Sequence, residues 1–368
     1  RMHASNLNFV PSDSGCSIEG DAIDCVCELL GVTREALNEA LCFRTITVRD
    51  KPIRSPLAED KTLKGLDAFT KAVYHAVFKL IVKRVNDKIA FKKTEDNQAE
   101  PQALIRILEI FGFESFQRNS FEQLCINYCN EVLQQQFNTF MLKNEQAEYV
   151  SEGLDWDMIT FPENEDVLDL ISAKGNGIVS ILDDMCKAPG TTDKSFALEI
   201  AKRCVTQTCF EASYDKGSME FTVTHFAGKV QYSIEDFIEK NRNDLPKETA
   251  SLLEGSTKSF VSALVSFLED SNQPGKGKIT VGGMFLQQVS ELSRKIESTK
   301  PHYVRCIKPI SKLVPGEYDR AMVSNQLRCG GILQAVGVTR DGFTLHYAHQ
   351  EFVERYLLVL KMKCHLKS

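Results

Sequence analysis

The stretch that decides the fold is residues 105–156, IRILEIFGFESFQRNSFEQLCINYCNEVLQQQFNTFMLKNEQAEYVSEGLDW. It begins within a short apolar run, 104–110, whose length and following glycine favour a buried strand. Phe-Gly-Phe-Glu comes next, at 111–114. From Ser120 to Val150 apolar residues keep helical spacing, which predicts a helix roughly 45 Å long at 1.5 Å per residue. The stretch therefore predicts a phosphate-sensing loop joined to a rigid rod.

The same reading places the other elements. Asn119 is the expected N-cap of the long helix, because Glu122 stands three residues later as in a capping box. A loop is expected over 8–22, where glycine, proline and polar residues gather. Helices are expected over 22–41, 63–89, 166–174, 178–186, 281–299, 323–335 and 350–359, and strands over 221–223, 230–232, 302–309 and 343–347.

Bulk composition excludes several classes of protein. The 368 residues are 43% hydrophobic and 26% charged, and 44 basic against 50 acidic residues give a net charge of −6. This balance argues against a general nucleic-acid binder. No run approaches the apolar length of a membrane span, and the first residues do not resemble a signal peptide.

Cysteine and histidine usage does not predict a metal site. The 12 cysteines are scattered without a Cys-x-x-Cys pair, which is typical of reduced thiols in a cytosolic protein. His346 and His349 lack a third ligand nearby in the sequence. We therefore expect the thiols and imidazoles to be structural.

The acidic loop carries a candidate chemistry. A carboxylate and a glycine at the end of a strand suit a nucleotide switch, because the acid can hold a Mg²⁺-bound water and the glycine lets a backbone N–H approach a phosphate. Glu109, Gly112 and Glu114 have this spacing. Taken alone the pattern is weak, since a solvated acidic turn would look the same.

Further motifs give the loop its context. Residues 109–114, EIFGFE, resemble the second switch of myosins, and SFEQLCINYCNEVLQQQFN resembles the start of the myosin relay helix. HYVRCIKP at 302–309 is similar to a strand of the central myosin sheet, NQLRCGGIL at 325–333 to the first reactive-thiol helix, and HFAGKVQY matches the family as well. The matches occur in family order over nearly the whole chain. The chain is thereby identified as a member of the myosin family.

The resemblance implies an α/β, P-loop-NTPase-like head fragment, mostly helical around part of a central mixed sheet. It also implies six segments: a partial upper actin-cleft subdomain at 1–103, a central strand and second switch at 104–116, the relay helix and loop at 117–160, a lower actin-binding subdomain at 161–300, a central strand with thiol helices at 301–342, and the start of the converter at 343–368.

Site roles follow from the resemblance position by position. Gly112 would donate its backbone N–H to the γ-phosphate of ATP, and Glu114 would pair with an arginine of the first switch. Glu109 stands where myosins place an aspartate beside Mg²⁺. Its extra methylene displaces the carboxylate by about 1.5 Å, which bears on the geometry that Mg²⁺ requires.

The mechanical relay is implied in the same way. Phe121 opens the relay helix, and Trp156, the only tryptophan, matches the residue that packs against the converter. Cys329 keeps the first reactive thiol, whereas the second falls on Thr339. Gly342 retains the swivel glycine before the converter.

The resemblance also implies a filamentous-actin surface. Lys51 stands where the family usually has an acidic or phosphorylatable residue, so regulation by phosphorylation is not expected there. Light chains or calmodulin would bind outside this chain, and the protein would be cytoplasmic and associated with the cytoskeleton. The expected actin-facing residues are Lys51, Lys276, Lys278, Val281, Gly282, Phe285, Leu286, Val289 and Leu292.

Two expected motifs are absent from the sequence. It contains no G-x-x-x-x-G-K-[ST] phosphate loop and no first-switch segment, both of which would be expected before residue 1. The fragment alone should therefore be inactive as an ATPase. Two functions stay open: an actin-based motor driven by ATP, or a catalytically silent myosin-like protein that tethers actin. An unrelated α/β domain would require the ordered matches to be coincidental.

Overall fold

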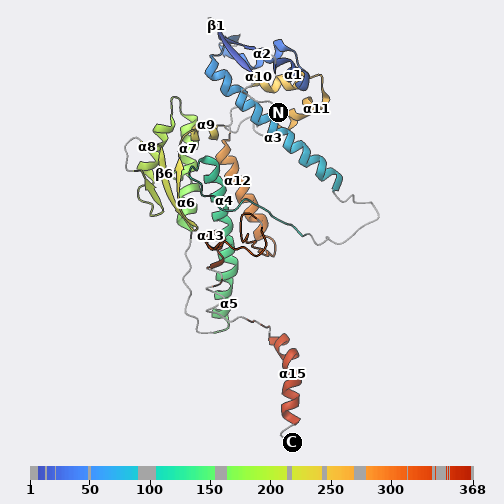
Figure 1. Cartoon of the computed structure of the whole chain (residues 1–368), viewed down its shortest axis with the longest axis vertical. Coiled ribbons are helices and arrows are strands. Elements are labelled where there is room, and N and C mark those ends of the chain that lie inside the picture. The colour runs from blue at the N-terminus through green and yellow to red at the C-terminus, as the bar shows by residue number, and fades with distance from the viewer. Residues whose placement is uncertain are drawn as a thin grey trace. The chain divides into compact units, whose positions relative to one another are not determined.

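The computed structural model in Figure 1 forms two compact units, each described by itself. One unit contains Arg1–Leu108 and Lys240–Val281, and the other contains Glu109–Glu239 and Gly282–Ser368. The segment 161–300 is thus divided between them. The structure describes residues 7–12, 15–20, 22–48, 51–89, 105–153, 164–213, 218–242, 247–268, 279–312, 314–333, 336, 345, 347 and 349–365.

The first unit packs helices beside two antiparallel hairpins. Its elements are β1 (Asn8–Ser12), β2 (Gly15–Glu19), α1 (Ala22–Leu30), α2 (Arg34–Cys42), β3 (Phe43–Val48), β4 (Lys51–Pro56), α3 (Glu59–Ile89), α10 (Lys247–Glu254), α11 (Ser259–Ser262) and the 3-10 helix Ala263–Phe267.

The core of this unit forms where α2, α3 and α10 meet. Leu37, Phe69 and Leu253 are each fully buried. Thr33 ends the α1–α2 turn as an N-cap, since its side chain accepts a hydrogen bond from the Ala36 N–H. The helices expected over 22–41 and 63–89 are therefore confirmed, with a break between α1 and α2.

The loop expected over 8–22 is wrong, because this segment forms the β1–β2 hairpin. Phe9 pairs with Ile18, and Phe9 and Cys16 bury their side chains in the core. The glycines that suggested a loop lie only at the tip and at the end of this hairpin, where Gly15 and Gly20 adopt positive φ. Burial of alternate residues outweighs the local polarity.

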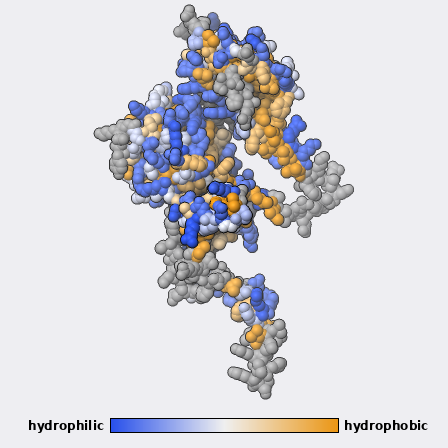
Figure 2. Space-filling model, in the orientation of Figure 1, coloured by the Kyte–Doolittle hydropathy of each residue, from blue (hydrophilic) through white to orange (hydrophobic). Residues whose placement is uncertain are grey.

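A stripe of apolar side chains is exposed along the second half of α3. Tyr74, Phe78, Ile81, Val85 and Ile89 follow one another at helical spacing and are 50–76% exposed. Figure 2 shows the hydrophobic surface on this helix. A continuous apolar face of this kind marks a contact surface.

The second unit is arranged around a long helix and one three-stranded sheet of order β5-β6-β7. Its elements are α4 (Phe121–Asn138), a π-helix (Thr139–Lys143), α5 (Asn144–Ser151), α6 (Glu165–Ser172), α7 (Ile178–Lys187), α8 (Asp193–Arg203), β5 (Phe210–Ala212), β6 (Glu220–His225), β7 (Gly228–Ser233), α9 (Phe237–Asn241), α12 (Val281–Glu297), α13 (Arg320–Cys329) and α15 (His349–His365). The hairpin expected around His225–Gly228 is confirmed.

The long helix expected over 120–150 is confirmed as α4, a π-turn and α5 in succession. Its N-cap is Ser120 rather than Asn119, and the capping partner is Gln123 rather than Glu122. The Ser120 N–H donates to Gln123 Oε1 at 3.0 Å. Asn119 is instead drawn away toward β7, where its Nδ2 donates to the Gln231 carbonyl at 3.0 Å.

The strands expected over 104–110 and 302–309 do not form in the described residues. Residues 105–110 and 302–309 carry no strand assignment, and Ile105 and Ile107 are 90% and 94% exposed. A strand requires a ladder of backbone hydrogen bonds, whereas among the described residues of these segments we find only one such bond, from the Asp319 N–H to the Pro309 carbonyl at 2.9 Å. Leu345 and Tyr347 of the strand expected at 343–347 are likewise not in a strand, and its other residues lie outside the described ones.

No described helix has both the length and the apolar character needed to cross a bilayer.

Replacing Phe69 by alanine should destabilise the first unit by about 3–5 kcal/mol, because the side chain is fully buried and leaves a cavity. Phe78→Ala on the same helix is the matched control, since Phe78 is 57% exposed. Urea unfolding followed by circular dichroism measures both changes. Equal effects would show that Phe69 is not a core anchor.

Candidate functional site

The acidic loop is fastened to the first turns of α4 by side-chain amides. Asn127 Oδ1 accepts from the Glu114 N–H at 2.8 Å, and Asn127 Nδ2 donates to the Glu114 carbonyl at 2.8 Å. Gln123 Nε2 donates to the Glu114 carboxylate at 3.2 Å. Asn130 Nδ2 donates to the Phe111 carbonyl at 3.1 Å. The helix therefore holds the backbone and the carboxylate of Glu114 together.

The exposed side of the loop is open at its glycine. A Cβ built on Gly112 would meet no atom within 4 Å, and the φ of Gly112 is not in the left-handed region. Neither packing nor backbone conformation therefore requires a glycine at position 112. An open backbone beside a half-buried carboxylate is the arrangement that lets an N–H approach a phosphate oxygen.

The metal chemistry of the loop depends on one carboxylate. Glu109 is exposed, and the described residues contain no group of three or more His, Cys, Asp or Glu side chains that could hold a metal. Mg²⁺ is commonly bound by one or two carboxylates together with substrate phosphates and waters. Glu109 fits that mode only as one ligand among others.

The middle of α4 is enclosed by two further segments. Phe285 of α12 stacks edge-on against Tyr128, and Gln136 Nε2 donates to Ser293 Oγ at 2.7 Å. Tyr303 packs edge-on against Phe137, with ring centroids 4.9 Å apart. The part of α4 from Tyr128 to Phe137 is therefore packed within this unit.

Comparison with known proteins gives this arrangement a family. All 368 residues match the family described as myosin head (motor domain). The chain belongs to the myosin head family. The second switch expected at 109–114 and the relay helix expected in α4 and α5 stay predictions.

Individual relatives agree with this assignment. The chain is 34% identical to Myosin-7 and 38% identical to Myosin-14, both of Arabidopsis thaliana, over 97% and 89% of its length. It is 36% identical to Protein OPAQUE1 of Zea mays over 98% of its length. It spans only 21%, 21% and 24% of these relatives, respectively.

Two of the residues expected to take part in the relay, Phe121 and Cys329, lie in the described part of the chain. Phe121 is buried and stacks edge-on against Phe237 of α9 at 5.6 Å. Cys329 ends α13, and burial raises the pKa of its thiol, which disfavours the reactive thiolate. Trp156, Thr339 and Gly342 lie outside the described residues.

The expected actin-facing residues fall in three environments. Lys51 is exposed at the start of β4, whereas Lys276 and Lys278 lie outside the described residues. On α12, Gly282 and Val289 are buried and Phe285 packs against Tyr128 of α4, so these three residues pack within the chain, and their contact with actin stays a prediction. Val281, Leu286 and Leu292 are half-buried.

Sequence reasoning missed a row of buried polar side chains on α4. Asn127, Glu131, Gln134 and Asn138 recur at intervals of four, three and four, and all are at most 5% exposed. The signal was available, because these polar residues occupy one helical face where apolar residues are expected. A buried polar stripe requires hydrogen-bond partners on the elements packed against it.

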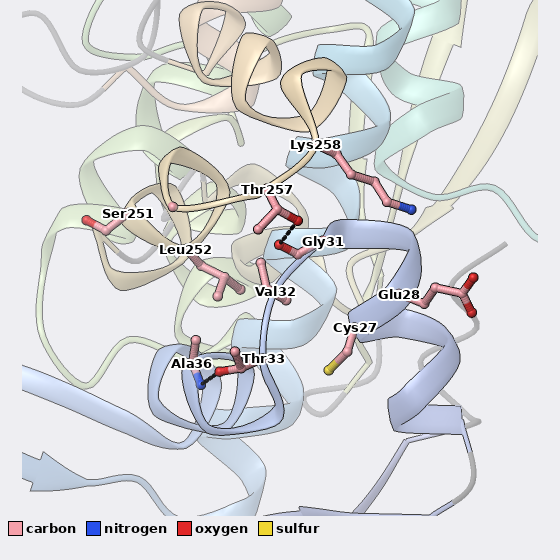
Figure 3. A pocket seen from close by; sticks show the side chains of 11 residues that line it. Cys27, Glu28, Gly31, Val32, Thr33, Ala36, Ser251, Leu252, Thr257 and Lys258 are labelled. Atoms are coloured by element: carbon pink, nitrogen blue, oxygen red, sulfur yellow. Dashed lines mark hydrogen bonds between the residues drawn. The ribbon is translucent and has the colours of Figure 1, made fainter.

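The first unit contains a cavity that can be compared with a nucleotide-binding site. Its volume is about 490 Å³, and Cys27, Glu28, Gly31, Thr33, Leu252 and Lys258 are among its lining residues (Figure 3). Burial raises the pKa of the Cys27 thiol, and the nearby Asp24 carboxylate adds to the effect. The Gly31 carbonyl is already bonded to Thr257 Oγ1 at 3.1 Å. With a single lysine and no glycine-rich loop, this cavity lacks the features of a nucleotide site.

Substituting Gly331 by alanine should destabilise the second unit by about 2–4 kcal/mol, because strain and overpacking add. Gly331 has φ +66, and an added Cβ would lie 2.3 Å from Nε2 of Gln134 on α4, a buried side chain held by its hydrogen bond to Asn138. Gly316→Ala is the control: Gly316 has φ +81 but nothing within 4 Å. Thermal unfolding should show the larger loss for Gly331; equal losses would exclude the close contact.

Proposed function

We propose that this chain is the part of an actin-based, ATP-driven motor that senses the nucleotide and transmits its state. The observation that carries the proposal is the attachment of the 109–114 loop to the relay helix through Asn127, Asn130 and Gln123. A shift of this loop on phosphate binding or release would move the first turns of the helix with it.

The roles of the loop residues follow from their surroundings. The Gly112 N–H is free of packing constraints and would contact the γ-phosphate, while Glu114 would pair with an arginine supplied by the first switch. Mg²⁺ would neutralise charge on the phosphates, with Glu109 acting through a bound water. In this structure the Glu114 carboxylate instead accepts a hydrogen bond from Gln123 Nε2.

The rod is suited to transmission. Helical structure continues from Phe121 to Ser151, roughly 45 Å at 1.5 Å per residue. A π-turn at Thr139–Lys143 interrupts the regular ladder, and such turns recur at functional positions in helices. We infer that the C-terminal end of this rod acts on the converter, through Trp156 and the swivel at Gly342.

Filamentous actin is the proposed partner of the other surfaces. Lys51 on an exposed hairpin, the 270–278 segment with Lys276 and Lys278, and the accessible side of α12 would face an acidic filament, where cations raise the encounter rate. The six-segment division of the head, light chains or calmodulin elsewhere in the protein, and a cytoplasmic location on the cytoskeleton belong to the same proposal.

A catalytically silent actin tether is the second candidate. Glu109 in place of aspartate and Lys51 in place of an acidic residue favour it. The first alters the reach of the carboxylate toward Mg²⁺, and the second alters the charge of an actin-facing hairpin. The two functions differ in whether nucleotide changes the affinity for actin.

Gly112→Ala should abolish most ATPase activity of the full-length protein without lowering its melting temperature. The added methyl meets no neighbour within 4 Å, so the fold tolerates it, but it would obstruct the approach of a phosphate. Gly65→Ala, which also meets nothing within 4 Å, is the control and should keep full activity. Unchanged turnover in Gly112→Ala would rule out the phosphate contact.

Residues 1–368 purified alone should hydrolyse ATP at a rate indistinguishable from buffer, with or without actin. The sequence contains neither a phosphate loop nor a first-switch arginine segment to complete the site. A phosphate-release assay measures this. Actin-stimulated turnover by the purified chain would overturn the assignment of roles.

Cosedimentation of the full-length protein with actin separates the two functions. A motor should be released from filaments by ATP, because nucleotide at the second switch changes the actin surface. A silent tether should bind equally with and without ATP. The readout is the bound fraction at several actin concentrations.

A further inference from the structure

We propose that Tyr232 and His225, on the β6–β7 hairpin, are positioning residues that hold the second-switch loop through Asn127. The catalytic consequence rests on the proposed function, whereas the bracing is a property of the folded chain. Among the described residues, neither the Tyr232 nor the His225 side chain forms a hydrogen bond with the 109–114 loop. Both act on the loop through Asn127.

The orientation of the Asn127 amide is fixed by three hydrogen bonds. Its Oδ1 accepts from the Glu114 N–H, and its Nδ2 donates to the Glu114 carbonyl and to the Tyr232 hydroxyl oxygen, each at 2.8 Å. Asn127 is fully buried. Rotating the amide by 180° would oppose donor to donor and acceptor to acceptor, so only one orientation satisfies the site.

The hydroxyl of Tyr232 then determines which ring nitrogen of His225 carries the hydrogen. Since its oxygen accepts from Asn127, its proton is directed to the remaining neighbour, His225 Nε2, at 2.8 Å. Burial raises the pKa of Tyr232 well above its ordinary value, which keeps that proton in place. His225 Nε2 is therefore an acceptor, and Nδ1 carries the ring hydrogen.

The chain of hydrogen bonds ends on a buried carboxylate. His225 Nδ1 donates to Glu131 Oε1 at 2.9 Å, and the Phe226 N–H donates to the same oxygen at 3.0 Å. Asn164 Nδ2 donates to the other carboxylate oxygen and, at 2.8 Å, to the Glu131 carbonyl. Glu131 lies on α4 one turn after Asn127, so the chain returns to the helix from which it started.

The hairpin also contacts the loop directly through apolar packing. Phe113 stacks edge-on against the rings of His225 and Phe226, at 5.2 and 5.6 Å. Five residues after the loop, just before α4, the Ser233 N–H donates to the Asn119 carbonyl at 2.8 Å. The loop is thus held between relay helix and hairpin, and the Tyr232 hydroxyl joins their polar contacts.

Hydrogen exchange of the whole chain tests the bracing without any nucleotide. In Tyr232→Phe, Asn127 Nδ2 and His225 Nε2 each lose a partner, so peptides covering 111–116 should exchange about tenfold faster. Tyr128→Phe is the matched control, because Tyr128 is the next residue on α4 and its ring packs against Phe285 of α12 instead. It should leave 111–116 unchanged, and equal exchange in the two variants would overturn the proposal.

The tautomer of His225 provides a test in the unmodified chain, so that the proposal does not depend on a variant folding. Long-range ¹H–¹⁵N spectra of histidine-labelled protein should show the Nδ1-protonated form, with the signal assigned by its loss in His225→Gln. An Nε2-protonated ring would contradict the hydrogen-bond direction that fixes Asn127.

Activity in the full-length protein separates the bracing from the proposed function. Tyr232→Phe should lower the ATPase rate about tenfold relative to Tyr128→Phe, in step with the faster exchange. Faster exchange with unchanged ATPase would keep the bracing and refute its catalytic consequence. Slower ATPase with unchanged exchange would refute the bracing itself.

Discussion

The two hydrogen bonds between the Asn127 side chain and the backbone of Glu114 are the constraint on which the rest of the site depends. One buried amide satisfies both the N–H and the carbonyl of Glu114, at 2.8 Å each. Leaving either group unpaired would cost about 1–3 kcal/mol, so the loop cannot leave the helix without a substitute partner. A loop that is coupled to a rod in this way moves with it.

The same device occurs a second time in the unit. Gln326 of α13 accepts from the Lys308 N–H and donates to the Lys308 carbonyl, both at 2.9 Å. In the first case the peptide lies in the expected loop, and in the second it lies in the segment expected to be a strand at 302–309. In both, a side-chain amide on a helix satisfies the backbone of a non-helical segment.

Particular residues explain where sequence reasoning succeeded. Apolar spacing placed the relay helix and the β6–β7 hairpin, because a period of 3.6 or 2 is a local property of the chain. A contiguous motif, not apolar spacing, brought Glu109, Gly112 and Glu114 together as candidates. Sequence reasoning failed at 105–110 and at Asn119, where the outcome depends on which groups of distant segments supply hydrogen bonds.

The sequence by itself determined the family, which is written in contiguous motifs, and the long helices and the β6–β7 hairpin, which follow from local apolar spacing. Only the tertiary structure decided that Tyr232 bonds to both Asn127 and His225, and that Phe285 and Val289 pack inside the unit. The physical reason is burial. A polar side chain removed from water must find partners, and those partners come from elements about a hundred residues away in the chain.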